Sequence, residues 1–136
     1  MNSTAQASQH IVDTVSHAAR QLVNAFASND TDTYFAAFTE DATFFFYTLP
    51  APLLSRAAYR AVWDSWQADG FVVLDCQSSN AHISLQGEVA IFMHDVATHV
   101  RFGQQESRYQ ERETIVLRQC EGRWLACHEH LSAIPE

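Results

Sequence analysis

The chain has 136 residues, of which 47% are hydrophobic and 18% are charged, and its formal net charge at pH 7 is −8. This length predicts one domain over residues 1–136, and the composition is too apolar for a disordered chain. All eight cationic residues are arginines. We expect no nucleic-acid partner, because the chain lacks a basic surface for phosphates, and no attraction to anionic membranes.

Cysteine usage and the N-terminal segment indicate where the protein works. Cys76, Cys120 and Cys127 are an odd number of thiols, and no two of them form a CxxC motif. This usage argues against a disulfide framework and predicts a cytoplasmic protein. The first residues lack the charged and apolar segments of a secretory signal, and no apolar run is long enough to cross a membrane.

The N-terminal half of the sequence predicts helices around a single strand. In the first helix, Ile11, Val15 and Leu22 belong to an apolar stripe at helical spacing. Ser55 is a plausible cap for a later helix, and Gly70 follows the end of that helix as a stop signal. The predicted elements, in chain order, are helices 8–28 and 32–38, a strand 42–48, a loop 49–55 and a helix 56–68.

After Gly70 the apolar residues recur at every second position, which is typical of strands. Segments 86–88, 102–106 and 120–122 predict the turns between these strands. Helices followed by an antiparallel meander predict the α+β class, with the helices packed on one face of a curved sheet. The predicted strands are 71–85, 88–102, 107–119 and 123–132.

Four segments of the sequence resemble a known superfamily. They are "FTEDATFFF" (38–46), "RAAYRAVWDSW" (56–66), "ISLQGEVAIF" (83–92) and "RETIVLRQCEGRWLACHEHLS" (112–132). The superfamily is the nuclear transport factor 2-like group, which is also called SnoaL-like. The last segment is similar to the end of the association domain of calcium/calmodulin-dependent protein kinase II.

The resemblance implies a cone in which three N-terminal helices wrap a strongly curved, mostly antiparallel sheet and enclose a pocket. It also implies pairing through the outer face of the sheet, so we expect a homodimer. The fold hosts enzymes, transport factors and oligomerisation modules. The resemblance therefore specifies the fold more closely than the function.

Two histidines near the C-terminus are the main candidates for a functional site. Alternate residues of a strand share a face, which places His128 and His130 on the same face as Trp124. Because Trp124 is large and apolar, we expect this face to point into the cone. A hairpin turn at 118–123 would then bring Glu113 opposite His128.

The likeness to the family implies that Asp95 also points into the cavity. A carboxylate raises the pKa of a neighbouring imidazole and burial lowers it, so the pair can exchange protons near neutral pH. His128, His130, Asp95 and Glu113 are therefore candidate catalytic residues. They would serve a cofactor-free lyase, isomerase or cyclase that acts on a hydrophobic small molecule.

Two other interpretations of His128 and His130 stay open. Both could be structural, because most buried polar groups are satisfied by hydrogen bonds. The His-x-His spacing could also present two imidazoles to a metal ion, with Asp95, His99 or Glu113 as a third ligand. Such short matches are common by chance, so we expect no metal and no cofactor.

The function stays open between two classes. The first is a dimeric ligand-binding, accessory or assembly protein, which the kinase resemblance favours slightly; the second is the enzyme above. In both, an unidentified small molecule would lie in a pocket lined by aromatic and apolar side chains. We expect these to be Tyr34, Tyr47, Trp63, Trp66, Met93, Ile115 and Trp124.

Overall fold

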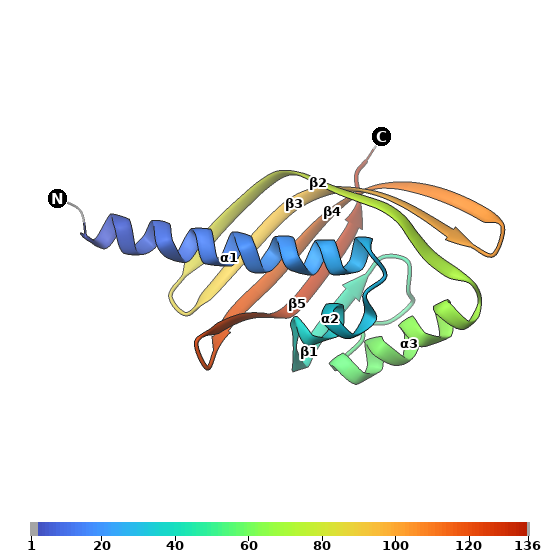
Figure 1. The fold of residues 1–136 in the computed structure, drawn as a ribbon, viewed down its shortest axis with the longest axis horizontal. Helices are drawn as coiled ribbons and strands as arrows, with labels where there is room; N and C mark the ends of the chain where they lie inside the picture. Colours follow the sequence, from blue (N-terminus) through green and yellow to red (C-terminus); the bar gives the residue numbers. More distant parts are fainter. Residues whose placement is uncertain (1–2, 136) are drawn as a thin grey trace.

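The computed structural model describes residues 3–135, which form three helices and one five-stranded sheet (Figure 1). The predicted α+β class is confirmed. None of the described helices is long and apolar enough to cross a membrane. The helices are α1 (Ser3–Ala27), α2 (Thr31–Ala36) and α3 (Arg56–Ala68). The strands are β1 (Phe38–Phe46), β2 (Phe71–Gln86), β3 (Val89–Phe102), β4 (Gln105–Cys120) and β5 (Arg123–Ala133).

The sheet has the strand order β1-β5-β4-β3-β2. Strands β2 to β5 form the predicted antiparallel meander, and β1 pairs in parallel with the free edge of β5. α3 carries the chain from β1 to the opposite edge, where β2 begins. Gly70 makes the turn into β2 at a φ of 89°, and a Cβ atom there would lie 2.9 Å from the backbone nitrogen of Gly103. Glycine is therefore required at this position.

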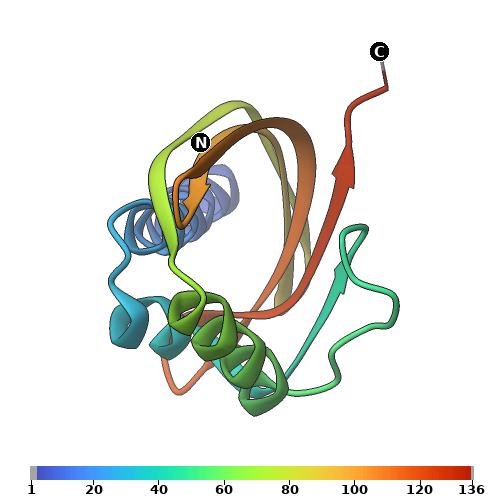
Figure 2. The ribbon, with the colours of Figure 1, turned by 90° about the vertical axis from the view of Figure 1, so that its right-hand side faces the viewer.

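The sheet is strongly bent, and its concave side is turned toward the helices (Figure 2). The register between β2 and β3 shifts between Val73 and Asp75, and again between Ser79 and His82. Such irregularities bend a strand and increase its twist. α1 packs along β2, and α3 packs against β1 and β2, so the helices cover the concave face.

An aromatic cluster fills the interior where α2 and α3 meet β1. Its rings lie at centroid distances such as 4.5 Å for Phe44 and Tyr59 and 5.2 Å for Tyr34 and Phe38. Many of the contacts are edge-to-face, which is a favourable arrangement for aromatic pairs. The buried members are Tyr34, Phe35, Phe38, Phe44, Tyr59 and Trp63.

A bulge in β5 decides which side chains enter the cone. Val116 and Leu117 are adjacent in β4, but their partners in β5 are His128 and Ala126. Cys127 is therefore an extra residue with no partner of its own in β4.

The bulge reverses the alternation of faces along β5. Trp124 and Ala126 precede it and are buried inside the cone. Glu129 follows it and is buried on the same side, whereas His128 and His130 point to the outer face. One extra residue is sufficient to exchange the inward-facing and outward-facing side chains, because side chains on a strand alternate with a period of two.

Candidate functional site

A cavity of about 270 Å³ lies between the concave face of the sheet and the helices. Small-molecule pockets typically measure about 300–1,000 Å³, so this cavity suits a small ligand. Its carboxyl groups come from β4 and β5, whereas most of the remaining wall is apolar. The apolar wall includes Leu22, Phe26, Phe46, Trp66, Phe71 and Phe102.

Glu129 of β5 presents a buried carboxyl group to this cavity. It is 1% exposed, and its Oε1 atom has no hydrogen-bond partner among the described residues. Burial raises the pKa of this carboxyl group well above its usual value, and the negative charge of Glu113 raises it further. The group therefore favours its neutral, protonated form and has an oxygen atom available for a ligand.

A chain of hydrogen bonds holds Glu113 at the cavity wall. Its Oε1 atom lies 2.8 Å from Nε2 of His94, and Nδ1 of His94 lies 2.6 Å from Oγ of Ser78. The side chain of His94 is completely buried. Because the carboxylate accepts from Nε2–H, the ring orientation is fixed. A carboxylate and an imidazole in direct contact can accept and return a proton.

Glu111 is the third carboxyl group of the cavity. It is 6% exposed, and it accepts a hydrogen bond of 2.7 Å from the hydroxyl group of Tyr47. Burial raises the pKa of Glu111, and the hydrogen bond from Tyr47 opposes this effect. In the described part of the chain, the ion pairs are formed by other acidic residues, so Glu111 has no cationic partner.

Tyr34 and Tyr59 add two phenol groups to the cavity wall, with their oxygen atoms 2.9 Å apart. Burial is the main cause that raises the pKa of both groups. Both phenols therefore stay protonated. The pair shares one hydrogen bond, so one hydroxyl hydrogen remains available to a neighbouring acceptor.

The charges around the cavity are strongly unbalanced. The chain contains no lysine, and none of its arginines lines the cavity within residues 3–135. Among the contacts of the three carboxyl groups that the structure describes, His94 supplies the one side chain that can carry a positive charge. Three acidic groups therefore face at most one cation.

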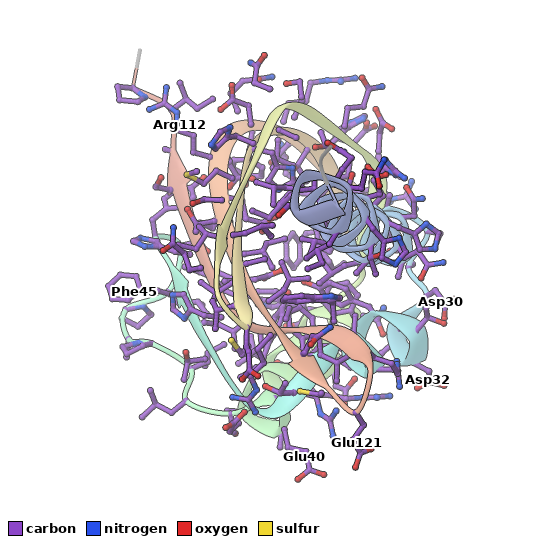
Figure 3. The ribbon with its side chains drawn as sticks, turned by 90° about the vertical axis from the view of Figure 1, so that its left-hand side faces the viewer. Asp30, Asp32, Glu40, Phe45, Arg112 and Glu121 are labelled. Carbon is purple, nitrogen blue, oxygen red and sulfur yellow. The ribbon has the colours of Figure 1, made fainter. Side chains whose placement is uncertain are left out.

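The structure places His128 and His130 away from this cavity, so their predicted position was wrong. Nδ1 of His128 lies 2.8 Å from Oγ1 of Thr43, and the ring of His130 lies 5.0 Å from that of Phe45. Phe45 points outward and is 51% exposed (Figure 3). Burial lowers the pKa of His128, and the neighbouring His130 lowers it further. The prediction assumed unbroken alternation through Cys127, where the strand has its bulge.

Asp95 and Met93 also lie on the outer face, although the prediction placed them in the cavity. Asp95 accepts a hydrogen bond of 2.8 Å from Asn80 and lies 3.6 Å from Arg112, which points away from the interior (Figure 3). Met93 is 37% exposed. The opposite row of β3, which contains His94, faces the cone. The register inferred from family likeness was therefore displaced by one residue.

The other predicted residues fall into three groups. Glu113, Tyr34 and Trp66 line the cavity, although Glu113 contacts His94 and not a β5 histidine. Tyr47 is exposed and reaches the site through its hydrogen bond to Glu111. The rest are buried in the core and do not line the cavity: Trp63, Ile115 and Trp124.

Sequence reasoning did not find Glu129, Glu111 or His94. One signal was available in β5, where the row of Glu129 continues with the apolar Leu131 and the alternate row continues with Ser132. The row of β3 that contains His94 is likewise more apolar than the alternate row. Each apolar row faces the interior.

No three His, Cys, Asp or Glu side chains lie close enough together to hold a metal ion in the region from residue 3 to residue 135. The His-x-His segment therefore gains no third ligand there.

The fold is similar to that of several solved structures. A candidate scytalone dehydratase from Novosphingobium aromaticivorans has a TM-score of 0.84 at 13% identity, with 97% of this chain and 89% of that chain covered. A candidate dehydratase of the nuclear transport factor 2-like family from Streptomyces avermitilis has a TM-score of 0.73 at 15% identity, with 92% and 97% covered. A protein of unknown function from Mycobacterium tuberculosis has a TM-score of 0.81 at 13% identity, with 98% and 77% covered.

At these identities the similarity shows the fold alone. No curated protein matches the sequence. The SnoaL-like domain family matches residues 15–136, a range that contains every residue of the cavity. The chain therefore belongs to the SnoaL-like domain family.

Proposed function

We propose that the protein is a cofactor-free lyase or isomerase that transfers a proton within a small, mainly apolar molecule. The observation that carries this proposal is Glu129, whose buried carboxyl group has a partnerless oxygen atom at the cavity. An unsatisfied buried polar group is destabilising, so its presence calls for an explanation. A substrate that accepts its proton would supply one.

The two inner carboxyl groups have environments that suit opposite roles. Glu113 accepts a hydrogen bond from His94, and its carboxylate is placed to remove a proton from a carbon atom next to a carbonyl group. Glu129 favours its protonated form and can donate to the carbonyl oxygen or to a departing hydroxyl group. In the second case the C–O bond breaks and water leaves, which is a dehydration.

Two of the similar structures belong to candidate dehydratases, which is in keeping with this proposal. At 13% and 15% identity, that similarity carries no residue roles to this chain. The roles assigned here rest on the contacts of Glu129, Glu113 and His94 alone.

Isotope exchange tests the proposal without knowledge of the natural substrate. The protein would be incubated in D₂O with cyclohexanone and with 3-hydroxycyclohexanone, and proton NMR would follow deuterium uptake and alkene formation. We expect exchange that falls by about 10²–10⁴-fold in Glu113→Gln and in Glu129→Gln. Glu88→Gln, in an exposed turn, is the matched control. Equal exchange by all four proteins, or none above the buffer rate, would refute the enzymatic proposal.

A second candidate function is assembly or ligand binding by a homodimer. The outer face of the sheet supports it, because Phe45 of β1, His130 of β5 and Met93 of β3 are exposed there. A dimer through this face would leave the cavity open to a bound ligand. Light scattering of the native protein and of a Met93→Glu variant tests it: a dimer that becomes a monomer supports this interface, and a native monomer rejects it.

A further inference from the structure

The cavity has an excess of negative charge that its own side chains do not neutralise. Glu111 and Glu113 are acceptors in short hydrogen bonds, and Glu129 is buried beside Glu113. If Glu129 holds a proton and His94 is charged, one negative charge still remains on the pair of Glu111 and Glu113. An isolated charge in such a desolvated place is costly.

Aromatic side chains line much of the cavity, and one of them, Tyr109, is close to Glu111 in the same strand. Tyr109 and Glu111 are alternate residues of β4, and both line the cavity. Phe71 and Phe102 pack at a centroid distance of 4.8 Å, and Trp66 lies 5.6 Å from Phe71. Aromatic faces attract cations, and the attraction strengthens when the site is desolvated.

We propose that this cavity takes a cation, specifically a small protonated or quaternary amine with an apolar body. Glu111 would neutralise the ammonium group, the aromatic wall would surround it, and the apolar body would extend toward Leu22 and Phe46. The same composition disfavours a carboxylate or phosphate ligand, because like charges repel and the cavity has no arginine among its described lining residues.

Size limits the candidates. At the packing density of protein interiors, about 0.74, a cavity of about 270 Å³ holds a molecule of roughly 200 Å³. That volume fits a single substituted ring with an amine and excludes a polymer. This inference rests on the proposed function, because the amine would be the substrate of the same site, and it adds the chemical class that the carboxyl groups select.

Three ligands of similar shape and different charge test the inference. They are 2-phenylethylamine, 2-phenylethanol and phenylacetate, and each would be titrated into the ¹⁵N-labelled protein at neutral pH while amide shifts are recorded. We expect the amine to bind about tenfold or more tightly than the alcohol, with shifts at residues of the cavity, and the acid to bind most weakly. The comparison uses the unaltered protein, so it does not depend on whether a variant folds.

A matched pair of variants locates the charge. Glu111→Gln should lose the preference for the amine and keep its affinity for the alcohol, whereas Glu88→Gln should keep both. Equal binding of the amine and the alcohol, tighter binding of phenylacetate, or shifts confined to the outer face would each overturn the inference. No binding of any of the three ligands would overturn it as well.

The outcome is separable from that of the isotope-exchange test. A preference for the amine without isotope exchange would keep the cation site and remove the enzymatic proposal. Exchange of the neutral ketones without any preference for the amine would keep the enzymatic proposal and remove the cation site.

Discussion

The inner face of β4 serves two different purposes along its length. Leu117 and Ile115 are completely buried and pack in the apolar core. Glu111 and Glu113 precede them on the same face of the same strand, and they line the cavity. The change occurs over two residues and involves no break in the pairing of β4 with β3.

The difference between these two halves shows how a core becomes a site. In the apolar half each side chain is surrounded by others, and close packing stabilises it. In the acidic half the backbone continues unchanged, but the carboxyl groups lack enough partners. Ile115 and Glu129 are directly paired across β4 and β5, so the boundary passes between two neighbouring side chains. We therefore expect substitutions in the two halves to differ in the sign of their effect on stability.

The largest expected effect concerns the bulge that places Glu129 inside. Deletion of Cys127 alone should keep Glu129 facing inward, because the extra residue is removed and regular alternation replaces it. Deletion of Cys127 and His128 together should turn Glu129 outward and remove most of the stability, which is about 5–15 kcal/mol in typical domains. Thermal unfolding followed by circular dichroism distinguishes them. A double deletion as stable as the single one would contradict the role of the bulge.

The apolar half should lose stability on truncation. Ile115→Ala removes a completely buried side chain, so we expect a loss of about 2–5 kcal/mol in the free energy of unfolding. Urea denaturation measures it. A loss well below 1 kcal/mol would show that Ile115 lies at the cavity, and the boundary between the apolar and acidic halves would then lie beyond it.

The acidic half should behave in the opposite way, with a dependence on pH, and Glu129 of β5 tests this because its carboxyl group lies beside Glu113. The pKa of Glu129 is higher in the folded state than in the unfolded state. Between these two pKa values the folded protein holds a proton that the unfolded chain has lost, so the free energy of unfolding falls as the pH rises through this range. Glu129→Gln removes this loss. Its advantage over the native protein should grow with pH from about pH 5, by at most about 1.4 kcal/mol per pH unit.

The measurement is the midpoint of thermal unfolding of both proteins over this pH range. Glu88→Gln again serves as the control, because the exposed turn should give no such trend. A difference between Glu129→Gln and the native protein that is constant with pH would show that Glu129 is not desolvated.

A smaller effect is expected at Tyr47, which links the acidic half to the end of β1. Tyr47→Phe removes the hydrogen bond to Glu111 and should cost about 1 kcal/mol. Urea denaturation would detect it. An unchanged free energy of unfolding would show that water replaces the phenol at this carboxyl group.

The smallest effect is expected on the outer face. His130→Ala should change the free energy of unfolding by no more than about 0.5 kcal/mol, because the side chain is exposed. Isotope exchange with the ketones should also be unchanged. A clear loss of isotope exchange in this variant would show that His130 takes part in the reaction.

The order of elements and the fold class could be predicted from the sequence because they depend on periodicity. The change from helical to alternating spacing at Gly70 correctly predicts the meander. The resemblance of four segments to the SnoaL-like group points to the family that the comparison shows. Both signals extend over many residues, so an error of one position does not alter them.

The site depends on single-residue register, and there the sequence is a poorer guide. Alternation counted from Trp124 reaches the wrong face after Cys127, since the bulge shifts the register there and the apolar Leu131 in the row of Glu129 is only a weak sign of it. In β3 the register taken from the family likeness favoured the row of Asp95, although the row of His94 is the more apolar one and faces the interior. Glu113 was the one predicted catalytic residue placed at the cavity, and its partner is on a different strand from the one expected.

One measurement tests most directly whether Glu129 is a neutral acid inside the cone. The side-chain carboxyl carbons of glutamate would be labelled with ¹³C, and their NMR shifts followed with pH in the native protein and in Glu129→Gln. We predict that the resonance missing from the variant has the shift of a protonated carboxyl group at neutral pH. If it instead titrates near the ordinary glutamate pKa of about 4.3, Glu129 is solvated and the cavity does not hold the neutral acid proposed here.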